Sequence, residues 1–322
     1  MKAIVCRKPG SPDVLTLEEI ERPVVPDDGV LVRVQASSVN PVDFFSLSGM
    51  AYVSRTLRVL KPKRAVLGTD FAGIVQSVGK SITQFQPGDE VFGGRSGAFA
   101  EFVCVRRAVV RKPANLTFEQ AAAVPVAAIT ALQALRDHGR VQAGQKVLIN
   151  GASGGVGTFA VQIAKSFGAD VTGVCSASNV EIARSIGADR VIDYAQEDFT
   201  RGGQRYDLMI DIAGNRPWSE CKRVLEPEGT LVAVGGSAHT VFGGGQTLRH
   251  FAGVRLASVG GSRKVIVFIA KLNTEDLLVL QELMAAGKVT PVIDRRYELS
   301  EVPAALRYMG DGHVKGKLVI NI

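Results

Sequence analysis

The chain of 322 residues is poor in the residues that bind metals or form disulfide bonds. It has four cysteines and four histidines, and no two cysteines are close in the sequence. The absence of a Cys-x-x-Cys motif excludes a sequence-evident zinc finger, and the spacing gives no disulfide framework. Reduced and mostly buried thiols are typical of a cytosolic protein, so a cytoplasmic location is expected.

Long apolar runs and one-sided charge are also missing. No stretch approaches about 18 uninterrupted apolar residues, so no membrane span is expected, and the N-terminal segment lacks the apolar core of a secretory signal. The net charge is +7, but basic and acidic residues alternate over most of the chain. Without a recognisable binding motif, nucleic acid is not expected as a partner. One segment, 55–64, is basic without any acid. It is interpreted as a solvated loop, with attraction of an anionic substrate or phosphate as the alternative.

The first 115 residues have the pattern of an antiparallel β domain. Glycine and proline punctuate short apolar stretches, which predict strands at 31–37, 72–79, 89–94 and 98–105. Thr117 and Gln120 then have the spacing of a capping box, which predicts a helix that Pro125 interrupts and that ends at Gly139.

Strands and helices alternate from residue 146 onward. Six apolar strands with intervening helices predict an α/β fold with a doubly wound parallel sheet. We expect these strands at 146–150, 170–175, 190–194, 206–214, 230–236 and 255–261. The tail after residue 274 reads helix, strand, helix, strand, and its last strand could rejoin the N-terminal domain.

The strongest motif is a glycine loop between a strand and a helix. The strand 146–150 runs into Gly-Ala-Ser-Gly-Gly-Val-Gly (151–157), and a helix follows. The N-terminus of a helix binds a pyrophosphate, and glycines let the backbone come close to it. Ala152 replaces the first glycine of the usual motif, and a tight turn is the alternative. In this context we predict dinucleotide binding, with contacts from Ser153, Gly154, Gly155 and Val156, while Gly157 lets the helix pack on the strand.

The end of the second strand indicates which dinucleotide binds. An acidic residue there would bind the ribose of NAD, but no carboxylate lies between Cys175 and Val180. Ser176 and Asn179 offer neutral donors instead, so NADP is favoured. Ser178 and Glu181 are also spaced as a capping box for the next helix.

Several segments together resemble the zinc-independent quinone oxidoreductase branch of the medium-chain dehydrogenase/reductase family. They are SSVNPVDFFSLSG (37–49), LGTDFAGIVQSVG (67–79), FQPGDEVFG (85–93), AAAVPVAAITAL (121–132), the glycine loop and GHVKGKLVI (312–320). The resemblance implies a β-rich GroES-like substrate domain formed by 1–122 and 265–322, a Rossmann domain at 123–264, and a homodimer.

The chain departs from the zinc-containing alcohol dehydrogenases of the same family. Those enzymes hold zinc with a cysteine in the first of these segments and a Gly-His-Glu in the second. This chain has Asn-Pro-Val-Asp and Gly-Thr-Asp there. Asp43 and Asp70 alone are a poor ligand set for zinc, so no metal is expected, and Asp70 is interpreted as a hydrogen-bonding residue.

The resemblance also implies roles for individual residues. Asn40 would face the ribose and nicotinamide, and Thr130 would lie near the nicotinamide. Asn40 could otherwise initiate a turn with Pro41, and Thr130 could be a buried helix residue. The remaining cofactor contacts implied in this way are Tyr194, Gly235, Ser237, Gly260 and Gly261.

These observations predict an NADPH-dependent oxidoreductase that transfers hydride to a quinone or an electron-poor alkene, in a cleft between the two domains. Asn40, Thr130 and Tyr52 are the candidate catalytic residues. Tyr52 is the only phenol in the substrate-loop stretch, but a surface aromatic is favoured, with water guided by Asn40 as the proton donor. A 2-enoyl thioester reductase and an NADPH-binding accessory protein with little turnover are the alternatives.

Overall fold

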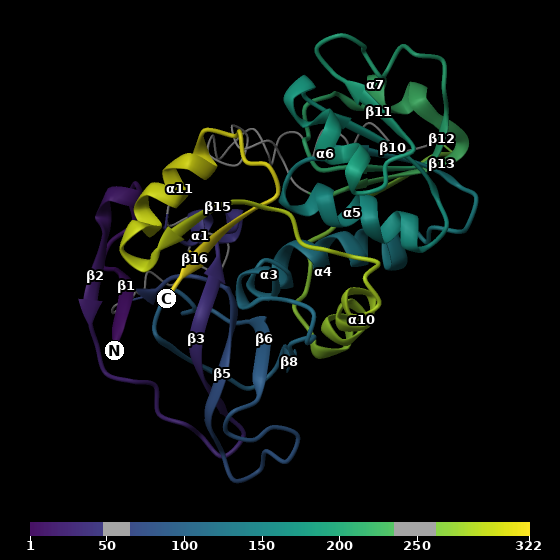
Figure 1. Ribbon diagram of the computed structural model, residues 1–322. Coiled ribbons are helices and arrows are strands. Elements are labelled where there is room, and N and C mark those ends of the chain that lie inside the picture. Colours follow the sequence, from purple (N-terminus) through teal and green to yellow (C-terminus); the bar gives the residue numbers. More distant parts are fainter. Residues whose placement is uncertain (48–64, 235–261) are drawn as a thin grey trace. The chain divides into compact units, whose positions relative to one another are not determined.

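The computed structural model describes residues 1–47, 65–234 and 262–322 (Figure 1). The chain divides into two compact units. Unit 1 comprises residues 1–127, 272–287 and 291–322, and unit 2 comprises residues 128–271 and 288–290.

In the part of unit 1 that the structure describes, the strands form two β-sheets. The smaller sheet has the order β2-β1-β4, and the larger has the order β15-β16-β3-β5-β6-β8, with β7 paired to β3. The strands are β1 (Lys2–Cys6), β2 (Leu15–Glu19), β3 (Val30–Ser38), β4 (Ala65–Val66), β5 (Asp70–Val78), β6 (Glu90–Gly94), β7 (Phe102–Val105), β8 (Val109–Arg111), β15 (Ile293–Glu298) and β16 (Lys317–Asn321). The strand predicted at 98–105 is shorter than expected, and Ala100 makes only an isolated bridge to Ala3. The C-terminal β16 pairs antiparallel with β3, so the tail rejoins the N-terminal strands in one sheet.

Among the described residues, four helices accompany these sheets. They are α1 (Pro41–Leu47), α3 (Phe118–Ala122), α10 (Thr274–Ala285) and α11 (Val302–Gly310). The capping box predicted at Thr117 is confirmed: its hydroxyl accepts from the Gln120 N–H at 3.2 Å, and the Gln120 side chain accepts from the Thr117 N–H at 3.0 Å. The break at Pro125 is confirmed too, because α3 ends at Ala122 and α4 (Pro125–Gln133) begins at the proline. Proline is tolerated there because the first N–H of a helix has no helical partner.

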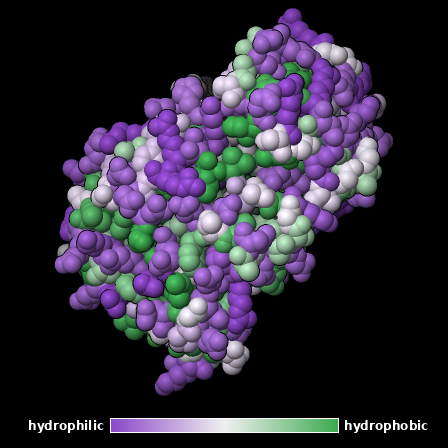
Figure 2. All heavy atoms as spheres, viewed as in Figure 1, coloured by the Kyte–Doolittle hydropathy of each residue, from purple (hydrophilic) through white to green (hydrophobic). Residues whose placement is uncertain are grey.

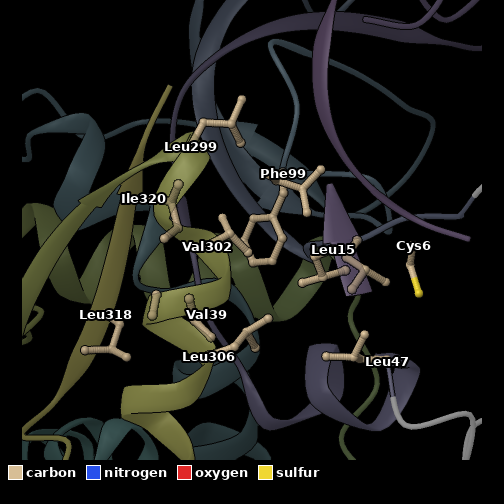
Figure 3. Close-up of a cluster of buried hydrophobic side chains, with 13 residues drawn as sticks. Cys6, Leu15, Val39, Leu47, Phe99, Leu299, Val302, Leu306, Leu318 and Ile320 are labelled. Atoms are coloured by element: carbon tan, nitrogen blue, oxygen red, sulfur yellow. The ribbon is translucent and has the colours of Figure 1, made fainter. Parts of the chain in front are cut away.

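A hydrophobic cluster in unit 1 fixes the direction of the side chains on β16. Leu318 and Ile320 point into this cluster together with Val39, Phe99 and Leu306 (Figure 3). Side chains on a strand alternate between its two faces. Lys317 is therefore directed away from the cluster, although it is itself only 3% exposed.

The described residues of unit 2 form a six-stranded sheet in which all neighbouring strands are parallel. Its order, β11-β10-β9-β12-β13-β14, is the doubly wound order of dinucleotide-binding domains. The strands are β9 (Lys146–Asn150), β10 (Asp170–Cys175), β11 (Arg190–Asp193), β12 (Tyr206–Asp211), β13 (Leu225–Ala233) and β14 (Lys264–Val267). Its helices include α5 (Gly155–Ser166), α6 (Val180–Ser185) and α7 (Trp218–Cys221). The predicted fold class is confirmed. The strand expected at 255–261 lies outside the described residues, and the sixth strand of the sheet is β14.

The capping box expected at Ser178 and Glu181 is wrong. A short 3-10 turn at 177–179 precedes α6, and Asn179 is the N-cap without a side-chain bond to the helix. The Ser178 hydroxyl donates to Asn179 Oδ1 at 3.3 Å instead, and Glu181 pairs with Arg184 at 2.9 Å. The turn places Ser178 one residue too early to cap the helix.

Hydrophilic residues dominate the face of the molecule seen in Figure 2, and hydrophobic residues occur there in small groups. The strongly exposed large hydrophobics of the described residues include Val24 and Ile269. Among the described residues, the helices are all too short or too polar to cross a membrane.

Candidate functional site

The glycine loop of unit 2 joins the carboxyl end of β9 to the start of α5. Gly151 has a φ of +95°, a left-handed conformation that suits glycine. The N–H groups of Gly151 and Ala152 donate to the Val174 carbonyl at 3.1 and 3.0 Å, which ties the loop to β10. Gly154 is the N-cap of α5, and no side chain of the described residues caps this end. The first amides of the helix are therefore available to an anion.

Two glycines of this loop have opposite surroundings. A Cβ atom on Gly157 would lie 2.0 Å from the Gly151 carbonyl oxygen and 2.8 Å from the Ala152 carbonyl carbon. On Gly154 the nearest atom would be the Gly151 oxygen at 3.6 Å. Gly157 thus allows the helix to pack tightly against the loop, whereas Gly154 borders open space in front of the helix N-terminus.

The ends of β9 and β10 bring together three of the residues that the sequence singled out. Asn179 donates from Nδ2 to Ser153 Oγ at 3.0 Å, and both residues are 8% exposed. Ser176 follows β10 and is half-buried, with its Oγ 3.3 Å from Ser178 Oγ. Asn179 therefore braces the glycine loop with one amide hydrogen, and Ser176 offers the more accessible hydroxyl.

Asp193 is a charged residue at this edge that sequence reasoning missed. It ends β11 and pairs in register with Cys175, the last residue of β10. Its Oδ1 accepts from the Ala195 N–H at 3.1 Å, while its buried Oδ2 has no hydrogen-bond partner among the described residues. Burial, with the Asp193 charge, raises the pKa of the Cys175 thiol to about 11. No acidic residue stands about 20 positions after the glycines, at the end of β10, but the neighbouring strand β11 places one beside that end.

Unit 1 contains a buried polar cluster formed by Ser38, Asn40, Asp43, Thr69, Asp70 and Lys317. Its centre is Asp70, which begins β5 and is fully buried. Asp70 Oδ2 accepts from Ser38 Oγ at 2.9 Å and from Asn40 Nδ2 at 2.8 Å. Its Oδ1 accepts from the Val126 N–H at 3.0 Å, in the first turn of α4, where a negative charge is favourable.

Lys317 provides the positive charge of this cluster. Its Nζ donates to Asn40 Oδ1 at 2.5 Å and to the Val39 carbonyl at 3.2 Å, and lies 3.6 Å from Asp70 Oδ2. Burial lowers the pKa of Lys317 and raises that of Asp70, and the charge of each residue opposes the shift of the other. Nothing near Asn40 in the sequence indicates this partner; the only signal is a lysine at the start of an apolar C-terminal strand.

Asp43 completes the cluster from the first turn of α1. Its Oδ2 accepts from the Asn40 N–H at 2.8 Å, and its Oδ1 accepts from Thr69 Oγ1 at 3.0 Å. Burial raises the pKa of this carboxyl group to about 7, and the charge of Asp70 adds to the shift. Asp43 is therefore a buried acid that titrates near neutral pH.

The cluster uses the whole side-chain amide of Asn40, which is 1% exposed. The Nδ2 group donates to Asp70 and, at 3.3 Å, to the Ser38 carbonyl, while Oδ1 accepts from Lys317. Asn40 also directly precedes α1, so it occupies the turn position that Asn-Pro predicts. Its immediate partners are protein groups, and its orientation is set by both charges of the cluster.

The other candidate residues are distributed as follows. Thr130 is buried on α4, and Tyr194, directly after β11, is 50% exposed. Gly155 and Val156 form the first turn of α5. Tyr52, Gly235, Ser237, Gly260, Gly261 and the basic segment 55–64 lie outside the described residues.

Comparison with known proteins places this geometry in a family. Residues 26–114 match the family described as alcohol dehydrogenase GroES-like domain, and residues 186–320 match the family described as zinc-binding dehydrogenase. A mitochondrial NAD(P)H oxidoreductase of Mus musculus is 34% identical over 100% of this chain and 89% of its own length. A chloroplastic quinone oxidoreductase of Triphysaria versicolor is 31% identical over 94% of this chain and 93% of its own. A 2-methylene-furan-3-one reductase of Solanum lycopersicum is 32% identical over 100% of this chain and 79% of its own.

Solved structures agree with the sequence comparisons. The quinone oxidoreductase of Coxiella burnetii has a TM-score of 0.86 at 31% identity, and the alignment covers 100% of this chain and 99% of that one. The chain belongs to the quinone oxidoreductase branch of the medium-chain dehydrogenase/reductase family. A second member of this branch, the Escherichia coli quinone oxidoreductase complexed with NADPH, has a TM-score of 0.84 at 26% identity, and the alignment covers both chains completely.

The described residues of this chain do not fit a catalytic zinc ion. They contain no group of three or more His, Cys, Asp or Glu side chains placed to hold a metal. The two carboxylates where relatives bind zinc, Asp43 and Asp70, already accept hydrogen bonds on both oxygens. The ammonium group of Lys317 lies beside Asp70 and would repel a cation. Zinc would need about three protein ligands at a catalytic site.

The expectation of a cytoplasmic location is wrong. The related oxidoreductases of Mus musculus, Bos taurus and Homo sapiens are named mitochondrial, and that of Triphysaria versicolor is named chloroplastic. The expectation rested on reduced cysteines and on the lack of a secretory signal. Both features are equally compatible with the interior of an organelle, so they do not distinguish it from the cytosol.

Proposed function

We propose that this chain is an NADPH-dependent oxidoreductase that transfers hydride to a quinone or to an electron-poor alkene without zinc. The observation that carries the proposal is the start of α5. Its amides are uncapped by side chains of the described residues, Gly154 borders open space, and Gly157 packs the helix against the loop. This arrangement fits a pyrophosphate.

The chain's own residues bind and orient the cofactor, and bound NADPH supplies the hydride. The amides of Gly155 and Val156 face the pyrophosphate from the first turn of α5. Asn179 holds Ser153 and thereby keeps the loop in place. These contacts are built from backbone and bracing side chains, so they are in position before the cofactor arrives.

The preference for NADPH rests on the end of β10. Ser176 provides a neutral hydroxyl where a carboxylate would favour NADH. Asp193, at the end of the neighbouring strand, carries a negative charge that weakens this preference, because like charges repel a 2′-phosphate. We therefore expect NADPH to bind more tightly than NADH, and we expect Asp193 to reduce the ratio of the two affinities.

The buried polar cluster favours quinones as acceptors. The acids Asp43 and Asp70 are both held by internal hydrogen bonds, and Asn40 is positioned by Lys317. Because these groups are buried and bonded within unit 1, we assign them to orienting the backbone at the start of α1 and not to donating a proton to a substrate. A quinone accepts hydride readily and can take its protons from water, so it does not need a positioned acid.

Enones are the second acceptor class. The reason is the relative named 2-methylene-furan-3-one reductase, whose substrate name describes an alkene conjugated to a ketone. This class needs a proton beside the carbon that receives hydride, so its rate depends more strongly on how water is guided to the site.

Steady-state oxidation of NADPH against quinones, enones and an enoyl-coenzyme A tests this proposal. We expect turnover with quinones and slower turnover with enones, unchanged by a metal chelator and without stoichiometric zinc in elemental analysis. Turnover with the enoyl thioester alone would assign the thioester reductase instead. NADPH binding without turnover of any acceptor would assign an accessory protein, and zinc lost together with activity would overturn the metal-free mechanism.

A further inference from the structure

A cationic cavity lies at the amino edge of the parallel sheet in unit 2. Its volume is about 590 Å³, and its lining includes Arg201, Arg205, Lys222, Arg223 and Arg263 but no acidic residue. Cavities of about 300–1,000 Å³ are the size that binds small molecules. The cavity is therefore large enough for a ligand and carries one sign of charge.

The topology separates this cavity from the dinucleotide site. Arg205 and Arg263 directly precede β12 and β14. Arg201 lies in the turn before β12, and Lys222 and Arg223 lie in the short 3-10 helix that leads into β13. These three strands are neighbours and parallel, so the residues before them gather at one edge. The glycine loop follows the carboxyl end of β9 in the same sheet and so lies at the opposite edge. Figure 1 shows β12, β13 and α7 in the green part of this unit.

Most of the positive charge in the cavity is not neutralised by the described residues. Arg205, Lys222 and Arg223 are exposed, and their side chains make no hydrogen bond or ion pair with another described residue. Arg201 pairs with Asp198 at 3.4 Å, but Asp198 also lies 3.6 Å from Arg216, outside the cavity lining. Grouping like charges around a concave surface raises the local positive potential and concentrates anions there.

Arg263 is oriented by the backbone. Its Nε and Nη2 donate to the Leu225 carbonyl at 3.2 and 2.9 Å. A guanidinium has five N–H donors, and those of Arg263 that do not bond this carbonyl are held in a fixed direction. A planar guanidinium held in this way matches the oxygens of a phosphate group.

We propose that this cavity binds a phosphorylated small molecule with at least two negative charges. The shared chemistry of its lining is guanidinium and ammonium groups, supplemented by the hydroxyl of Ser219. Because the cavity and the glycine loop lie at opposite edges of the sheet, this ligand is not the dinucleotide itself. This proposal is independent of the acceptor that the enzyme reduces.

Calorimetric titration with tripolyphosphate tests the site, in about 0.15 M salt to screen weak surface attraction. The titration uses protein saturated with NADPH, so that the glycine loop is occupied. The variant Lys222→Gln/Arg223→Gln removes two exposed cations of the cavity. The matched control, Lys8→Gln/Lys80→Gln, removes the same charge from exposed positions of unit 1.

We expect the wild-type protein and the control to bind tripolyphosphate equally, and the cavity variant to bind it at least about tenfold more weakly. NADPH binding should be the same in all three proteins, which shows that the variants are folded. Failure of the wild-type protein to bind tripolyphosphate would overturn the proposal. So would equal affinities in the cavity variant and the wild-type protein, or an equal loss in the control.

Discussion

Replacing Gly157 with alanine should destabilise the protein, although alanine is normally the better helix former. In the interior of a helix, alanine is favoured over glycine by about 1 kcal/mol. At this position the new methyl carbon would lie 2.0 Å from the Gly151 oxygen, at least about 1 Å closer than the separations real side chains show. The neighbouring atoms belong to the backbone of the loop, so they cannot rotate away. Overpacking of this kind costs about 1–3 kcal/mol, and the clash should therefore outweigh the gain in helix propensity.

The matched control is Gly154→Ala. Gly154 has a φ of −81°, which any residue adopts, and its added methyl would meet nothing closer than 3.6 Å. We expect its free energy of unfolding to change by less than about 0.5 kcal/mol. Its affinity for NADPH should nevertheless fall, because the methyl enters the space in front of the α5 amides.

Urea unfolding without cofactor and fluorescence titration with NADPH separate these two effects. Gly157→Ala should lose stability and, because the start of the helix moves, at least about tenfold in NADPH affinity. Gly154→Ala should lose affinity only. A Gly157→Ala protein as stable as the wild type would refute the packing argument, and a Gly154→Ala protein with full affinity would refute the position of the pyrophosphate.

Three further predictions concern charged residues. Between about pH 4 and 7, folded Asp43 keeps a proton that the unfolded carboxyl group, with a pKa of 3.8, has lost. The free energy of unfolding of the wild type, measured relative to that of Asp43→Asn, should therefore fall by about 1.4 kcal/mol for each pH unit in this range. Parallel pH curves of the two proteins in urea unfolding would contradict this. Lys317→Met should lower the free energy of unfolding by about 3–5 kcal/mol, because it leaves Asp70 buried without its counter-charge. Adding Asp70→Asn should recover part of this loss. If the effects of the two substitutions simply add in this double-mutant cycle, the two residues are not coupled. Ser176→Asp should weaken NADPH relative to NADH in fluorescence titrations, and Asp193→Asn should strengthen it; an unchanged ratio in both would place the 2′-phosphate elsewhere.

The sequence predicts the fold of unit 2 well because its signals are local. A strand followed by glycines and an amphipathic helix can be recognised within about 20 residues, and the parallel, doubly wound sheet follows from the alternation of the remaining strands with helices. The capping box at Thr117 is of the same kind. At Ser178 the same local rule fails, because the 3-10 turn at 177–179 shifts the start of α6 and makes Asn179 the N-cap.

The sequence does not predict contacts that depend on sheet pairing. Lys317 reaches Asn40 across 277 residues because β16 pairs with β3, and no local pattern encodes that register. Asp193 reaches Cys175 for the same reason, through the pairing of β10 and β11. In both cases the residue is visible in the sequence as a charged group next to an apolar strand, but its partner is decided by topology.

The glycine loop and the buried polar cluster differ in how many of their polar groups already have partners, and this difference indicates how the chemistry is divided. The glycine loop has backbone donors at the start of α5 that no side chain of the described residues caps. In the buried polar cluster, Asn40, Asp43 and Asp70 are already matched with partners inside unit 1. Donors without a partner can bind a ligand. Polar groups that are all bonded to one another instead fix a conformation, because disrupting their bonds would leave buried charges unpaired. Under the proposed function the cofactor supplies the reactive group, and the buried polar cluster holds the turn between β3 and α1 in one orientation.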